Sequence, residues 1–146
     1  MVNATEPIAV SAGGGVIVVS KGLLRRVTNE SQFAFVLAHE IAHDCLNHLE
    51  GDLNEARRNY EEEVEADSYA LGLVALSGYD PRAAIGALVH LYPSRFDSSQ
   101  EGSRKELLSR LASLQEKLDR SGWEPPGTVD RRSFQLLRRS LYETKG

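Results

Sequence analysis

The sequence has only one cysteine, Cys45, among its 146 residues, so no disulfide can form within the chain. This usage fits a reducing compartment, although a single cysteine is also compatible with an oxidising one, and a chain of this length can bury a core without disulfides. Apolar runs long enough to span a membrane are missing, and the first residues lack the charged-then-apolar order of a signal peptide. Blocks of basic residues are missing too, and a formal net charge of -4 gives no support for nucleic-acid binding. The hydrophobic content of 41% is ordinary for a soluble globular domain.

The residues that are present predict a short β-hairpin followed by helices. Residues 7–20, PIAVSAGGGVIVVS, hold two β-branched runs around three glycines, which is typical of a hairpin. Apolar residues at helical spacing, with capping pairs such as Asn29 and Gln32 or Ser103 and Glu106, predict the helices. The helices are expected over about 30–49, 54–76, 81–93, 103–118 and 130–142. We therefore predict a single domain over residues 1–146, α+β but mostly α, with a small N-terminal sheet and about five helices.

The strongest chemical signal is the motif HEIAH, which runs from His39 to His43 inside the first long predicted helix. Residues four apart lie about one turn apart on the same side of a helix, so these two histidines can grip one metal ion. Imidazole nitrogen suits zinc, and Glu40 would lie beside the metal, where it can take a proton from water. A polar turn on a surface helix is the alternative, but it fits poorly because apolar residues surround the pair. His48 would lie about 180° from His39 on a continuous helix, so packing or capping is its expected role.

A catalytic zinc site needs three protein ligands and an open position, and the acidic stretch 61–67 can supply the third ligand. Glu63 and Asp67 share one helix face with two alanines, whose small side chains would let two helices approach closely. We therefore predict Glu63 as the third ligand and Asp67 as an acceptor for the far nitrogen of a zinc-bound histidine. The other acidic residues of the stretch are expected to face water: Glu61, Glu62 and Glu65.

At these residues the sequence resembles the HtpX-like and CAAX-prenyl-protease family of zinc metallopeptidases, within the gluzincins. The histidine motif lies in VLAHEIAHDCLNH at 36–48, and the family's Glu-x-x-Ala-Asp signature appears as EVEAD at 63–67. GYDP at 78–81 and GGGVIVVSKGLL at 13–24 are also similar to family segments. The resemblance covers roughly residues 8–118 and implies a zincin-like metallopeptidase domain, followed by a C-terminal helical extension.

The resemblance also implies roles for particular residues. His39, His43 and Glu63 would bind one Zn²⁺ per chain, and Glu40 would be catalytic. An edge strand along which a peptide substrate could add is implied for Val16, Ile17, Val18, Val19 and Ser20.

One segment departs from the family pattern. Relatives often carry His-Pro before an arginine-containing helix, whereas this chain reads Ser-Arg-Lys at 103–105. Arg104 is therefore a candidate to stabilise the oxyanion, since a cation can stabilise developing negative charge.

The sequence thus favours a zinc metalloendopeptidase that acts on protein or peptide substrates, with Glu40 as general base. A zinc-stabilised chaperone-like or adaptor domain of the same fold, with little or no turnover, is the alternative. A helical interaction domain without metal is a third reading. The resemblance implies relatives that are commonly membrane-anchored or exported and often act in protein quality control, so any membrane association of this protein would need segments outside the chain.

Overall fold

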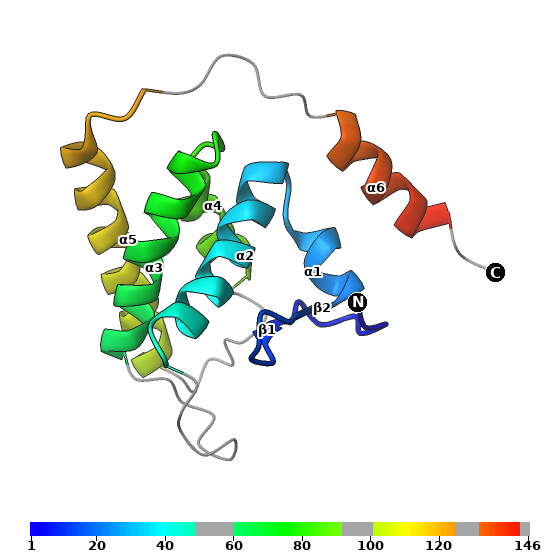
Figure 1. Cartoon of the computed structure of the whole chain (residues 1–146), viewed down its shortest axis with the longest axis horizontal. Coiled ribbons are helices and arrows are strands. Elements are labelled where there is room, and N and C mark those ends of the chain that lie inside the picture. Colours follow the sequence, from blue (N-terminus) through cyan, green and yellow to red (C-terminus); the bar gives the residue numbers. More distant parts are fainter. Residues whose placement is uncertain (49–59, 92–100, 125–131, 144–146) are drawn as a thin grey trace.

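The computed structural model describes residues 1–48, 60–91, 101–124 and 132–143, and these residues are mostly helical (Figure 1). Within these ranges a two-stranded antiparallel sheet precedes six helices. The elements in chain order are β1 (Ala9–Ser11), β2 (Ile17–Val19), α1 (Lys21–Arg26), α2 (Glu30–Cys45), α3 (Tyr60–Leu76), α4 (Ala83–Leu91), α5 (Glu101–Ser121) and α6 (Arg132–Glu143). The mostly helical α+β class with a small N-terminal sheet is confirmed.

The helix that the sequence did not predict is α1, whose six residues are too few to show a helical period. Ser20 caps it, because the Ser20 hydroxyl accepts a hydrogen bond from the Leu23 N–H at 3.0 Å. The chain before β1 packs closely against this helix: a Cβ on Gly22 would overlap the carbonyl oxygens of Thr5 and Glu6. The amino-terminal segment is thereby held at the base of the hairpin.

For α2, the start predicted from the sequence is confirmed and the predicted end is wrong. The helix begins at Glu30 as predicted, and the Asn29 side chain accepts from the Gln32 N–H at 2.9 Å. It ends at Cys45 and not near residue 49, because Asn47 adopts a left-handed conformation with φ of 57°.

Other predicted boundaries differ or lie beyond the described residues. Helix α5 begins at Glu101, so Ser103 lies inside the helix and the predicted cap at Ser103 is wrong. The described part of α3 begins at Tyr60, and the predicted start near residue 54 lies outside the described residues. The predicted loop at 94–102 falls mostly outside them as well.

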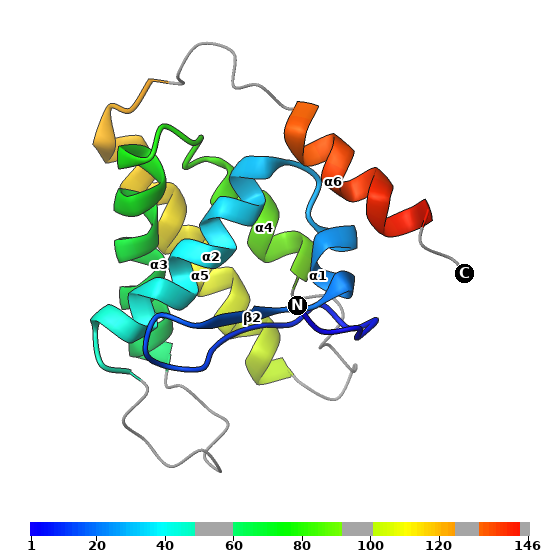
Figure 2. The same cartoon turned by 45° about the vertical axis from the view of Figure 1, so that its right-hand side comes forward.

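Helix α2 occupies the centre of the arrangement, in contact with α3, α4 and β1 (Figures 1 and 2). Helix α5 packs against α3 and α4, while α6 lies on the side of α1. The apolar faces of these helices form one core, to which α2 contributes Phe35, α5 contributes Leu114 and α6 contributes Phe134. The C-terminal helix therefore belongs to the same core as the sequence motifs. Among the described helices, none combines the length and apolar character needed to cross a membrane.

Candidate metal centre

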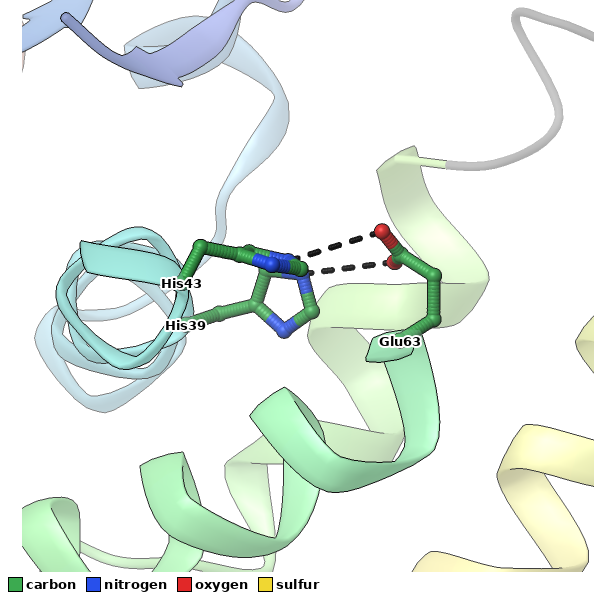
Figure 3. A group of neighbouring side chains, drawn as sticks. All are labelled: His39, His43 and Glu63. Atoms are coloured by element: carbon green, nitrogen blue, oxygen red, sulfur yellow. Dashed lines mark hydrogen bonds and ion pairs between the residues drawn. The ribbon is translucent and has the colours of Figure 1, made fainter. Parts of the chain in front are cut away.

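Three potential metal ligands converge between α2 and α3 (Figure 3). His39 and His43 extend from α2 towards Glu63 on α3, and their Nε2 atoms lie 3.0 Å apart. The nearest Glu63 oxygens lie 3.4 Å from His39 Nε2 and 3.5 Å from His43 Nε2. The His43 side chain is fully buried, while those of His39 and Glu63 are 12% and 13% exposed. The residues that the sequence predicted as ligands are therefore close neighbours.

The donor set and its spacing fit zinc. In a tetrahedral site with ligands at about 2.0–2.1 Å, two ligand atoms lie about 3.3–3.4 Å apart. The observed separations of 3.0, 3.4 and 3.5 Å bracket that value. Two imidazoles and a carboxylate also match the ligand types of catalytic zinc sites, which keep a fourth position open.

A buried arginine, Arg110 of α5, joins the acidic side of this group. Its Nε and Nη2 donate to the two Asp67 oxygens at 2.7 and 2.8 Å, and its Nη1 donates to Glu63 Oε2 at 2.6 Å. These three bonds hold both carboxylates in place, and the one to Glu63 reaches Oε2, the oxygen nearest His39. Burial by itself raises the pKa of Glu63 and Asp67, but contacts with His39 and the Arg110 charge outweigh it and lower both, with His43 adding to the effect on Glu63. Both groups are therefore carboxylates at neutral pH.

Asp67 also lies against the far side of His39. Its Oδ1 is 2.9 Å from His39 Nδ1, a short contact whose direction departs from that of an ideal hydrogen bond. Burial lowers the pKa of His39, yet the adjacent Asp67 and Glu63 carboxylates outweigh burial and raise it to about 9. Without a metal, a proton on His39 thus neutralises part of the negative charge at the site. A bound cation would replace that proton.

Glu40 lies next to His39 on α2 and is buried, with 6% exposure. Its carboxylate is bonded to the sheet. The Ser11 N–H of β1 donates to Glu40 Oε2 at 3.0 Å, and the Ser11 hydroxyl donates to Asp44 one turn further along α2. A pocket of about 140 Å³ adjoins the group, with Glu40, His39, Glu63 and Arg110 among its lining residues and apolar side chains around them. Space for a small part of a substrate therefore exists beside the predicted general base.

The sheet places β1 next to α2. Ala12 and Ile8 share hydrogen bonds with Val16 and Ser20 across the hairpin, so the alternate residues Ala9 and Ser11 direct their backbone groups away from β2. The segment expected as the edge strand, Val16 to Ser20, contains β2 and the buried cap Ser20, and Val2 donates to the Val19 carbonyl on its outer edge. The strand edge that faces α2 therefore belongs to β1, and on it the Ser11 N–H is bonded to Glu40.

The sequence reasoning missed Arg110 and named Arg104 instead. Arg104 is exposed on α5, six positions before Arg110 along the same helix. A signal for Arg110 was present, because it falls among leucines at helical spacing (Leu107, Leu111 and Leu114). A cation on an apolar helix face is buried only with carboxylate partners, and the acidic stretch could supply them.

Fold and site together define a small zincin-like domain with a His-His-Glu group on two adjacent helices. Comparison with known proteins agrees with this class, since the model of peptidase family M48 matches residues 8–57. That match contains the HEIAH motif and the hairpin, and it ends before Glu63.

Similar proteins extend the comparison over nearly the whole chain. The chain is 30% identical over 143 residues to the "Beta-barrel assembly-enhancing protease" of Escherichia coli O157:H7 and to that of Escherichia coli strain K12. The protein of the same name from Shigella flexneri matches equally well. These alignments cover 98% of this chain and 25% of each relative, so the chain spans about a quarter of the length of these proteins.

Proposed function

We propose that residues 1–146 form a single zinc metalloendopeptidase domain of the M48 type, in which His39, His43 and Glu63 hold one zinc ion. The convergence of these three ligand atoms, all within 4.8 Å of one another, is the observation that carries the proposal. The M48 match over the motif helix and the similarity to a named protease support it.

Zinc bound at this group would supply Lewis acidity to a peptide carbonyl and to water. Glu40 is the general base in the proposed mechanism: it takes a proton from the attacking water and then delivers it to the leaving amine. The Ser11 N–H holds the Glu40 carboxylate near the pocket, and Arg110 holds Glu63 and Asp67. These contacts prepare the arrangement before a substrate arrives.

A peptide substrate is proposed to add as a further strand at the outer edge of β1, where the backbone groups of Ala9 point away from β2 and the Ser11 N–H is bonded to Glu40. This edge lies closer to Glu40 than the segment at 16–20 that the family resemblance implied. The relatives are named for β-barrel assembly. A protein with unpaired β-strands would suit a site that binds substrate by strand addition, so we propose incompletely folded proteins as the substrate class.

The first test is zinc per chain, measured by elemental analysis after dialysis against metal-free buffer. We expect about one zinc in the wild type and a clear loss in Glu63→Ala, because two histidines alone make an incomplete site. Glu61→Ala is the matched control, since Glu61 is an exposed carboxylate two residues away on the same helix. Absence of zinc from the wild type, even after zinc is added back, would reject the proposal.

The second test is hydrolysis of an unfolded protein such as reduced casein. Glu40→Gln should lower the rate about 10²–10⁴-fold while zinc content is unchanged, because the general base is lost and the ligands are kept. A wild type that binds zinc and casein without cleaving it would favour the chaperone-like or adaptor function instead.

A further inference from the structure

The end of α2 turns back towards the metal group and brings His48 with it. Asn47 has a positive φ of 57°, and the His48 N–H donates to the His43 carbonyl at 3.0 Å. This turn brings the His48 ring against the His43 ring, with centroids 5.1 Å apart and Nδ1 atoms 3.0 Å apart. His48 therefore lies beside the predicted ligand, although a continuous helix would have carried it to the opposite face.

The other nitrogen of His48 faces a carboxylate on α3. Its Nε2 lies 3.4 Å from Glu65 Oε2, within ion-pair distance. The His48 side chain is 7% exposed, whereas that of Glu65 is 62% exposed. Glu65 thus faces water as predicted, but it also ends a row of groups that runs inwards through His48 to His43.

The positions of the protons in this row follow from one requirement. If Nε2 of His43 binds a metal, a neutral His43 must carry its single proton on Nδ1. Because the two Nδ1 atoms are 3.0 Å apart, that proton is donated to Nδ1 of His48, which must then be bare. A neutral His48 carries its own proton on Nε2, the nitrogen that faces Glu65.

We infer that His48 is a positioning residue of the metal site: its Nδ1 accepts the His43 Nδ1 proton, which fixes the tautomer and orientation of His43. Glu65 favours the matching tautomer of His48. The inference rests on the proposed function, because it assigns His43 to a metal. It gives His43 a counterpart to the Asp67 carboxylate beside His39.

The burial of the two partners decides how much each contributes. The contact of His48 with His43 is largely shielded from water, and loss of such a supporting partner lowers metal affinity by about 10–100-fold. The contact with Glu65 is exposed and long, so its contribution is expected to be about threefold or less.

The test measures zinc affinity by competition with a chelator in wild type, His48→Leu and His48→Asn. His48→Leu keeps a similar volume without an acceptor, and it should weaken zinc binding about 10–100-fold. His48→Asn keeps an oxygen near the position of Nδ1 and should recover most of the affinity. His90→Asn is the control, because His90 lies on α4 with its Nδ1 beside Gln32 and is not among the three grouped ligands. Affinity of His48→Leu within twofold of wild type, or equal losses in the Leu and Asn variants, would overturn the inference.

The tautomers themselves can be observed without any variant. The chain has four histidines, so long-range ¹H–¹⁵N correlation spectra of the zinc-loaded wild type can resolve every ring. We expect His48 to be protonated on Nε2 and His43 on Nδ1. A His48 ring protonated on Nδ1 would overturn the inference, because that proton would point at the His43 proton. A merely structural role for His48 would not require this pattern.

These outcomes are separable from failure of the proposed function. If the wild type binds no zinc, the zinc site itself is rejected. If the wild type binds one zinc while His48→Leu binds it equally well, only the role of His48 is rejected. Glu65→Gln, compared with the exposed control Glu61→Gln, then measures the smaller outer contribution.

Discussion

The two sides of α2 are stabilised in opposite ways. One side carries His39, Glu40 and His43 into a buried polar cluster, in which the histidines contact carboxylates of α3 and an arginine of α5 contacts the same carboxylates. The other side carries Phe33, Leu37 and Ile41, which line an apolar groove of about 490 Å³ together with residues of α3 and α6.

The two sides of α2 differ in what the loss of one side chain does to the groups around it. In the polar cluster, removal of one partner leaves another charge buried without compensation, so effects are large and depend on which group is lost. In the groove, the contribution of each side chain to folding stability follows the apolar area that it buries, and no hydrogen-bond orientation or opposite charge has to be matched. Changes in the cluster should therefore alter zinc binding and stability together, whereas changes in the groove should alter stability alone.

The largest effect is expected for Arg110→Met. This change leaves the Glu63 and Asp67 carboxylates without their buried cation, which should lower the free energy of unfolding by about 3–5 kcal/mol. The loss should be smaller in the zinc-loaded protein, because the metal compensates Glu63. Urea denaturation with and without zinc measures both values, and a loss below about 1 kcal/mol without zinc would contradict the ion-pair network.

A change in the groove provides the comparison. Phe134 of α6 is 5% exposed, and its ring lies 6.1 Å from that of Phe33. Phe134→Ala should lower the free energy of unfolding by about 3 kcal/mol through lost burial and a cavity, with zinc affinity within twofold of wild type. Leu136→Ala, at a 65% exposed position of the same helix, should change stability by less than about 0.5 kcal/mol. A clear loss of zinc affinity in Phe134→Ala would break the separation between the two sides.

The pH dependence of the metal-free protein tests the charge balance of the cluster. The pKa of His39 is raised from 6.5 to about 9, so its protonated form is favoured by folding. That contribution is complete below pH 6.5 and is lost as pH rises through 9, on the order of 2 kcal/mol. Glu63 and Asp67 have lowered pKa values, so their contribution is present above their ordinary pKa range and lost only in acid.

Thermal unfolding at pH 6, 7.5 and 9.5 without metal should therefore show stability falling over this range. With zinc bound to its Nε2, His39 is neutral and keeps only its Nδ1 proton, so it does not titrate over this range and the fall should be much smaller. Zinc affinity should rise over the same range, because protons stop competing for the ligand. Equal stability at pH 6 and 9.5 in the metal-free protein would show that His39 is not held protonated.

The smallest effect is expected for Arg104→Ala. Its side chain is exposed on α5, so stability should change by less than about 0.5 kcal/mol and zinc content should stay the same. The exposed position also favours unchanged casein turnover, which would remove Arg104 as an oxyanion stabiliser. A tenfold loss of kcat at constant zinc content would instead support that role and extend the polar cluster to this residue.

Local patterns in the sequence predicted much of the fold. The glycine run predicted the hairpin, Asn29 predicted the start of α2, and the apolar spacing predicted the larger helices. The short α1 and the early end of α2 were not predicted. Both depend on tight local turns and close contacts, which leave no periodic signal.

The sequence by itself determined the ligand types and their spacing, because a helix brings residues four apart to one side wherever it lies. It therefore predicted His39, Glu40 and His43 directly, and Glu63 from the face it shares with two alanines. Only the tertiary structure decided which distant groups meet them. Arg110 from α5, Ser11 from β1 and the returning His48 reach the site through helix packing, strand placement and one left-handed turn. Such contacts join residues far apart in the chain or follow from a single backbone angle, so the leucine spacing around Arg110 indicates that it is buried but not which groups it meets.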